Sequence, residues 1–306
     1  MSLRLVEKIR AIEQRHAQRG GDVIRRNPGG IQSTGWPAVD AAIGGGLACG
    51  GLHEWLGLAP CSSHSEVAQR TREAWRPPVG VLIHLAWRVL DTDAGGLWSV
   101  WIGRRCFPYP GALLRREGSD RLLLERSLFV SPRQPADRLW AIDLALRSPA
   151  VGVLIADGGE FDMAATRRIQ LLAKNHGVLA LLVRPPWEQA ELSAAQTRWL
   201  VRQESAGEPW TSVRAESPRR LKPAAQKVKH SASRLGATDL ANPTWSIELL
   251  RCKGVHWEQA QDFWNLEWDR AACTLHLSTA LGNPAGAAQA PPVNAGRGGR
   301  LSRRLA

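Results

Sequence analysis

The chain has 306 residues, and 44% of them are hydrophobic, so it can build one large domain or two small ones around a real core. Its five cysteines form no CxxC pair and no Cys/His cluster, which argues against a disulfide framework and a zinc site and favours a reduced, cytoplasmic protein. The sequence contains no apolar run of membrane-spanning length and no signal peptide, so we expect no membrane association.

The net charge of +12 is concentrated in two segments. Residues 212–235 carry seven Lys or Arg and one Glu, and residues 285–306 carry four Arg and no acid. Both segments are poor in large apolar residues, which predicts that they are disordered. Two roles fit them equally: non-specific binding to the phosphate backbone of DNA, or solubilising tails without a partner. The DNA-binding candidates are Arg219, Arg220, Lys222, Lys227, Lys229, Arg297, Arg300, Arg303 and Arg304.

Residues 3–19 are predicted to form an amphipathic helix in which Leu5, Ile9 and Ile12 share one apolar face. A Pro/Gly break follows, so we treat residues 1–27 as an N-terminal helix with its linker. The apolar face has two equally good interpretations. It binds a partner protein, or it folds back on the rest of the chain.

Between residues 52 and 184 buried strands alternate with helices. We expect strands at 52–57, 97–103, 150–157 and 178–184, and helices at 81–90, 135–148 and 162–177. Asp162 and Gly177 have the residue types of an N-cap and a C-cap for the last helix. This alternation predicts an α/β fold with a mostly parallel, twisted sheet and helices on both faces.

After Pro185 the hydrophobic pattern changes to strict alternation in "TRWLVRQ", "TWSIELLRCKG", "FWNLEWD" and "CTLHLS". These segments predict half-exposed strands that extend the sheet in antiparallel fashion. Arg184, Arg198 and Arg202 then form either a basic strip or, as we favour, a solvated sheet face. The expected domain covers residues 33–278 with a flexible basic insertion at about 205–243, and residues 279–306 form a disordered basic tail.

The stretch "STGWPAVDAAIGGGLACGGLHEWLG" resembles the opening of the RecA-type recombinase core. The matching residues are Ser33, Thr34, Gly35, Val39, Asp40, Gly45, Gly46, Leu47, Glu54 and Gly57. The similarity continues in the same order through "YPGALL", "VGVLIAD" and "IELLRCKG", over roughly residues 33–277. It implies a RecA-like core and places a phosphate-binding loop directly after residue 57.

That phosphate loop is degenerate. A working loop needs small residues, a lysine for the β- and γ-phosphates and a Ser/Thr hydroxyl for Mg²⁺. Counted from Gly57, the second glycine, the lysine and the hydroxyl positions hold Ser62, Ser63 and His64, and residues 58–69 contain no Lys, Arg or Gly. We also expect this loop to be an extended excursion, because the next helix starts late.

A second catalytic position also departs from the recombinase pattern. The resemblance implies a water-activating acid after the strand at 97–103, where Gly103, Arg104 and Arg105 stand instead. Asp157 ends the strand "VGVLIAD", either as a relic of the metal-binding position or as part of an ordinary Asp-Gly turn. We therefore expect no catalytic residue, no cofactor, no metal and no ATPase activity.

Three later segments, "ELSAAQTRWLVRQES", "WSIELLRCKG" and "WNLEWD", carry a narrower resemblance. Its matching residues are Ser193, Ala194, Ala195, Arg198, Trp199, Arg251, Cys252, Lys253 and Gly254. These segments resemble the ImuA family, a RecA-like branch that is also similar to the SulA cell-division inhibitors.

This resemblance implies a non-catalytic accessory protein in SOS-induced, error-prone translesion DNA synthesis. The implied partner is a Y-family-like polymerase homologue (ImuB-like), and RecA and an error-prone replicative polymerase are further candidates. The alternative is a SulA-type inhibitor that binds a tubulin-like division protein.

One distinctive string is left without a role. In "WIGRRCFPYP", Arg104 and Arg105 stand beside Phe107 and Tyr109 at the carboxyl end of a predicted strand. Parallel sheets bind their ligands at that end. The sequence therefore predicts a recognition surface here but does not indicate its ligand.

Overall fold

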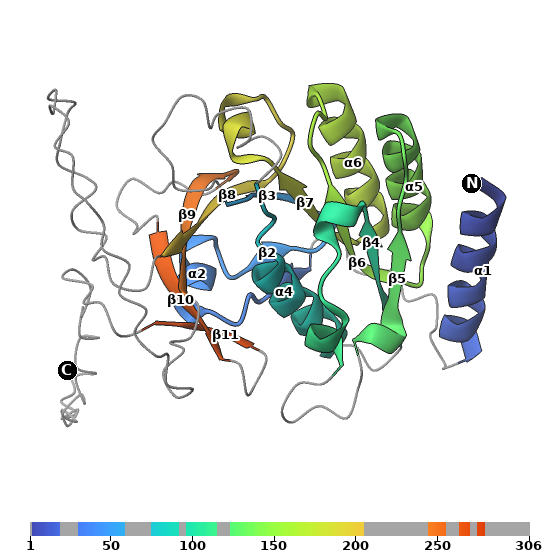
Figure 1. Ribbon diagram of the computed structural model, residues 1–306, viewed down its shortest axis with the longest axis horizontal. Coiled ribbons are helices and arrows are strands. Elements are labelled where there is room, and N and C mark those ends of the chain that lie inside the picture. Colours follow the sequence, from blue (N-terminus) through green and yellow to red (C-terminus); the bar gives the residue numbers. More distant parts are fainter. Residues whose placement is uncertain are drawn as a thin grey trace, which may run out of the picture.

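The computed structural model describes residues 2–18, 30–58, 75–91, 96–114, 123–204, 244–254, 263–269 and 274–278. These residues form a nine-stranded sheet with helices on both faces and a small two-stranded sheet, β1 (Ile31–Gln32) with β2 (Leu47–Ala48) (Figure 1). The expected α/β architecture is confirmed. The basic insertion at 205–243, the tail at 279–306 and all nine DNA-binding candidates lie outside the described residues.

Six strands form the parallel part of the large sheet, in the order β5-β4-β6-β7-β3-β8. Their bounds are β3 (Leu52–Leu56), β4 (Trp98–Ile102), β5 (Ser127–Val130), β6 (Val151–Asp157), β7 (Leu179–Arg184) and β8 (Thr197–Glu204). The sequence predicted β3, β4, β6 and β7 from their continuous apolar runs. It missed β5, an edge strand of four residues of which one is fully buried, because so short a segment carries little periodicity.

The antiparallel part consists of β9 (Thr244–Cys252), β10 (Phe263–Asp269) and β11 (Thr274–Leu277). We had grouped β8 with these strands, but β8 runs parallel to β3 and antiparallel to β9. The change of direction therefore falls between β8 and β9. The basic insertion connects these two neighbouring strands, as the sequence predicted.

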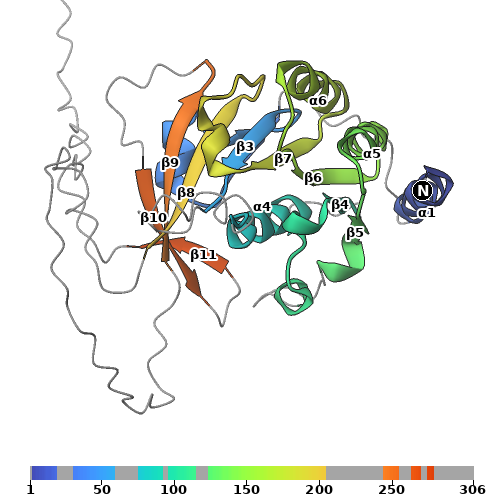
Figure 2. The same cartoon turned by 45° about the horizontal axis from the view of Figure 1, so that its top comes forward.

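Within the part of the chain that the structure describes, five α-helices flank the sheet: α1 (Ser2–Gln18), α2 (Pro37–Ala42), α4 (Val79–Asp91), α5 (Pro135–Arg147) and α6 (Met163–His176). Figure 2 shows α5 and α6 on one face of the sheet and α4 on the other. Asp162 caps α6 by accepting a hydrogen bond from the Ala165 N–H at 2.8 Å, and Gly177 ends it with a left-handed φ of 64°. Both predicted caps are confirmed. No described helix is long and apolar enough to cross a bilayer.

Helix α1 lies beside α5 at one end of the molecule (Figure 1). Leu5, Ile9 and Ile12 are buried in the same hydrophobic core as residues of α5, α6 and β6. The structure thus shows the second of our two alternatives, the helix folded back on its own chain. A partner would meet these three side chains only after α1 had left α5.

Tryptophans fill the opposite core. The rings of Trp55 and Trp199 stack with centroids 5.2 Å apart, and Trp264 packs on Trp199 at 6.0 Å. Trp55 and Trp199 are completely buried. The prediction that Trp199 packs under the sheet is confirmed, so this residue of the ImuA-like pattern is part of the core.

His53 on β3 predicts a pH dependence of stability. Its Nδ1 lies 2.8 Å from Thr197 Oγ1 and its Nε2 lies 3.1 Å from Ala48 O, and burial lowers its pKa from 6.5 to about 4. As the pH falls, His53 is protonated in the unfolded chain before it is protonated in the folded protein. The contribution of neutral His53 to the stability of the fold is therefore complete above about pH 6.5 and is lost between pH 6.5 and 4.

We expect the protonation of His53 to lower the free energy of unfolding by about 2 kcal/mol when the pH falls from 7 to 5. Urea unfolding of the wild type and of His53→Gln at both pH values measures this contribution. The variant should lose that part of the pH dependence. An identical dependence in both proteins would show that His53 does not titrate as its burial requires.

Candidate functional site

The strands β3, β4, β6 and β7 end at one edge of the sheet, where parallel sheets bind ligands. The chain leaves β3 through Gly57, whose N–H donates to Arg184 O at 2.8 Å. Leu58 and Arg76 then exchange two backbone hydrogen bonds of 2.7 and 3.1 Å, and α4 begins at Val79. A phosphate loop passes directly from strand to helix, whereas here the strand exit is paired with a returning segment. Ser62, Ser63 and His64 lie between its two ends, outside the described residues.

Asp157 lies at the end of β6 and is engaged by the protein itself. Its Oδ2 forms an ion pair with Arg138 Nη1 at 3.0 Å, and its Oδ1 accepts the Gly159 N–H at 3.1 Å. The second contact is the Asp-Gly turn that was one of our two alternatives. A Cβ added to Gly103, whose φ is 98°, would lie 2.7 Å from Asp157 Cβ. The ends of β4 and β6 are therefore packed too closely for a side chain at residue 103.

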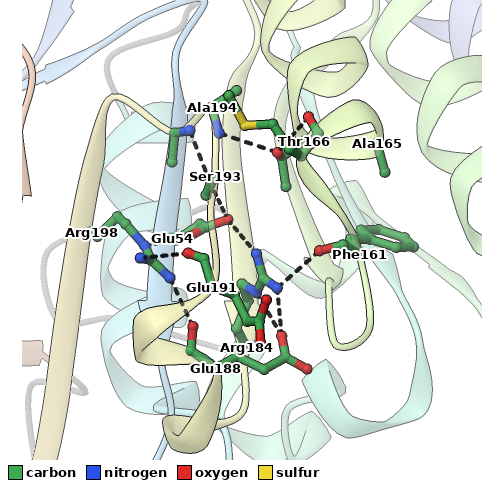
Figure 3. A network of polar contacts seen from close by, with 12 residues as sticks. Glu54, Phe161, Ala165, Thr166, Arg184, Glu188, Glu191, Ser193, Ala194 and Arg198 are labelled. Atoms are coloured by element: carbon green, nitrogen blue, oxygen red, sulfur yellow. Dashed lines mark hydrogen bonds and ion pairs between the residues drawn. The ribbon is translucent and has the colours of Figure 1, made fainter.

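A buried ionic network joins the middle of β3, the end of β7 and the start of β8 (Figure 3). Its centre is Glu54 on β3, which is completely buried. Glu54 Oε1 accepts from Arg184 Nη1 at 3.1 Å and from Ser193 Oγ at 2.6 Å, and its Oε2 accepts from Arg198 Nε at 2.7 Å. One carboxylate therefore fixes two buried guanidinium groups, which come from β7 and β8.

The two arginines also hold the segment that follows β7. This segment includes the short 3-10 helix η4 (Pro186–Ala190). Arg184 donates to Glu188 Oε2 at 2.7 Å and to Phe161 O at 2.9 Å. Arg198 donates to the carbonyls of Glu188, Gln189 and Glu191 at 2.9 to 3.1 Å. Charge-assisted hydrogen bonds of this kind are stronger than neutral ones, so η4 is firmly attached to the sheet.

Several residues of the ImuA-like pattern meet at this place. Arg251 Nη2 donates to the carbonyls of Ser193 and Ala195 at 2.8 and 2.9 Å, and Lys253 Nζ donates to Ala194 O at 2.8 Å. The Ser-Ala-Ala element and the Arg-Cys-Lys element are 56 or more residues apart in the sequence, yet they are joined by hydrogen bonds. These hydrogen bonds hold the 185–196 segment on the sheet.

This network corrects our interpretation of the three arginines. Arg184 and Arg198 are 1% and 6% exposed and form neither a basic strip nor a solvated face. They can be buried because the carboxylates of Glu54 and Glu188 pair with their charges and backbone carbonyls accept their other N–H groups. Arg202 is exposed as expected, but it pairs with Glu248 at 2.6 Å.

A cleft of about 790 Å³ opens at the same edge. It is lined by the Arg138–Asp157 pair, by Arg104 and Arg105 of the unassigned string and by Trp187 of η4. Arg105 lies over the ring of Trp75 at 5.2 Å. Of the residues for which the sequence predicted a recognition surface, Arg104 and Arg105 line this cleft, whereas Phe107 and Tyr109 are not among its lining residues.

The fold and this edge define an α/β protein whose parallel strands end in a buried ionic network beside a charged cleft. No protein-family model matches the chain. It is 26% identical over 240 residues to Protein ImuA of Caulobacter vibrioides, in sequences from two strains, which covers 75% of this chain and 81% of that protein. Among solved structures, that of the RadB recombinase aligns with 79% of this chain and 98% of its own, at 11% identity and a TM-score of 0.46.

Proposed function

We propose that this protein is a nucleotide-independent accessory factor of damage-induced mutagenesis, which brings an error-prone polymerase to damaged DNA. The similarity to ImuA over three quarters of the chain supports the process. The ImuA-like sequence pattern supports a Y-family-like polymerase homologue as the direct partner, with RecA and an error-prone replicative polymerase as further partners. The basic segments at 212–235 and 285–306 supply a non-specific affinity for DNA in this proposal.

The observation that carries the proposal is that the protein's own contacts occupy the carboxyl ends of β3 and β6. Catalysis on a nucleotide needs a lysine and free backbone N–H groups after β3 and a carboxylate that acts on Mg²⁺ or water. Here the strand exit is occupied by the Leu58–Arg76 pairing, and the Asp157 carboxylate is neutralised by Arg138. These contacts favour a scaffold over an ATPase.

The buried network supports the same conclusion from another direction. A partner-binding protein gains affinity when its contact segment is ordered before the partner arrives. Glu54, Arg184 and Arg198 order the 185–196 segment at the cost of burying three charges. We infer that this edge of the sheet is built to present a fixed surface.

Calorimetric titration of the full chain with Mg-ATP tests the nucleotide-independent part of the proposal. We expect no heat of binding and no shift in melting temperature, because residues 58–69 contain no lysine that could meet the charge of the β- and γ-phosphates. A RecA-type ATPase measured under the same conditions is the positive control. Micromolar binding, or ATP turnover that Asp157→Asn abolishes, would contradict the proposal.

A further inference from the structure

The charges that line the cleft are divided between its two sides. Arg104 and Arg105 follow β4, and Arg133 follows β5. Glu160 follows β6, and Glu191 follows η4 after β7. Because the sheet order is β7-β6-β4-β5, the arginines stand on one side of the cleft and the two glutamates on the other. The cleft therefore has a basic wall and an acidic wall.

These five side chains are exposed, so their charges are available to a ligand. The Arg138–Asp157 pair between the walls uses its own charges internally, and Arg138 Nη2 also donates to Gly159 O at 2.9 Å. On the basic wall, Arg104 Nε donates to Ser131 Oγ at 2.9 Å, which fixes its direction. Helix α5 starts at Pro135 on the same wall, so its positive N-terminal dipole adds to the arginines.

The acidic wall contains a strained residue. Glu160 has a φ of 71°, and it is the one non-glycine residue with positive φ in the described part of the chain. Its N–H donates to Glu188 Oε1 at 2.9 Å, which holds the strained turn. A glycine would adopt this conformation without strain, so keeping a glutamate costs stability. A carboxylate retained at such a position in a cleft points to a role in binding.

Two aromatic side chains also line the cleft. Trp75 is buried and packs edge-on against Trp187, with ring centroids 6.3 Å apart. Trp187 is 42% exposed on η4, the segment that Arg184 and Arg198 hold in place. An exposed tryptophan on a fixed segment is the kind of residue that anchors protein partners.

We propose that this cleft binds a peptide segment of a partner protein that carries charges of both signs. A carboxylate of the segment pairs with Arg104, Arg105 and Arg133, a Lys or Arg pairs with Glu160 and Glu191, and an apolar side chain packs on Trp187. The inference deepens the proposed accessory function and rests on it for the kind of partner.

The acidic wall decides between a peptide and a nucleic acid. A nucleic-acid strand carries a negative charge at every phosphate, so Glu160 and Glu191 would repel it along one side of the cleft. A peptide can alternate its charges within a few residues and match both walls. The mixed cleft therefore favours a peptide, and the arginine wall gives that peptide its direction.

The test begins with a phage-displayed library of random peptides selected against the full wild-type chain. An enriched peptide is then synthesised with a fluorophore, and its binding is measured by polarisation to four proteins: the wild type, Arg105→Glu, Glu160→Gly and Arg167→Glu. Arg167 is an exposed arginine of α6 away from the cleft, so its reversal is the matched control for Arg105. A dT20 oligonucleotide is the competitor.

We expect peptides with both signs of charge and about a tenfold loss of affinity for Arg105→Glu, which replaces an attractive charge pair by a repulsive one. Glu160→Gly should lose about threefold, because solvent screens the exposed pair that it removes. Arg167→Glu should bind like the wild type. Glu160→Gly should melt at the same or a higher temperature than the wild type, which separates lost binding from lost folding. Exchanging the carboxylate of the peptide for Arg should restore binding to Arg105→Glu.

Three results would overturn the site. The selected peptides carry charges of one sign only, their affinity is the same for the wild type and for both cleft variants, or dT20 displaces them from the wild type but not from Arg105→Glu. These results are separable from the accessory function. If Arg105→Glu and Glu160→Gly still support damage-induced mutagenesis, the cleft proposal falls and the accessory function stands. If Mg-ATP binds, the nucleotide-independent function falls while peptide binding in the cleft is still measurable.

Discussion

Replacing Glu54 by Gln should lower the free energy of unfolding by about 3–5 kcal/mol. Glu54 is completely buried and is the anion that Arg184 and Arg198 share, at 3.1 and 2.7 Å. The amide keeps the shape of the side chain but removes its charge and turns a donor toward a guanidinium group. Two buried cations then lose their shared partner carboxylate, which is why the cost is much larger than that of one hydrogen bond.

Glu248→Gln is the matched control for this change. Glu248 on β9 pairs with Arg202 at 2.6 Å, but the Arg202 side chain is 56% exposed, so solvent screens the pair. We expect a loss of about 0–1 kcal/mol there. Chemical denaturation of the wild type and of both variants at pH 7 measures the difference. Equal small losses for the two variants would show that Glu54 does not carry the network.

The same variant has a consequence for the cleft. Arg184 and Arg198 hold η4, and η4 carries Trp187 and leads to Glu191. Loss of Glu54 should therefore loosen one wall of the cleft as well as the core. Faster amide hydrogen exchange over residues 185–196 in Glu54→Gln would reveal this coupling.

Most of the sheet was predictable because burial on both faces leaves a readable signal. Strands β6 and β7 are continuous apolar runs, and the caps Asp162 and Gly177 marked α6 to within one residue. The direction of β8 was not predictable. Its alternating pattern is the same for a parallel and an antiparallel neighbour, and its two neighbours in the sheet differ.

The candidate site was only half visible in the sequence. The departure from the phosphate-loop pattern could be read directly, because residues 58–69 contain no lysine. The Glu54 network could not be read, since Glu54 lies more than a hundred residues before both Arg184 and Arg198 in the sequence. The sequence nevertheless contained a signal. Glu54 stands inside one buried strand and Arg184 ends another, and charged side chains are buried in such strands only when they have partners.

The cleft illustrates the same limit. Arg104 and Arg105 stood out in the sequence as a surface without a ligand. Nothing in the sequence placed Glu160 opposite them, because the two walls meet only through the strand order of the sheet. The positive φ of Glu160 is likewise a property of the folded turn.

Deleting the gene should abolish damage-induced mutagenesis. In the proposed function the protein brings the error-prone polymerase to damaged DNA, so cells without it cannot use that polymerase after ultraviolet irradiation. The wild-type gene supplied in trans should restore mutagenesis. Ser63→Ala and His64→Ala should restore it equally well, because these phosphate-loop positions carry no nucleotide chemistry in our account.

The frequency of ultraviolet-induced mutations in the deletion strain and in these complemented strains therefore tests whether the protein supports mutagenesis without a nucleotide. We expect irradiated deletion cells to show only the mutation frequency of unirradiated cells, and full recovery with the wild type and with both loop variants. An unchanged frequency in the deletion strain, together with division arrest on overproduction, would contradict it in favour of a division inhibitor. Failure of the loop variants to restore mutagenesis would contradict the claim that the protein works without a nucleotide.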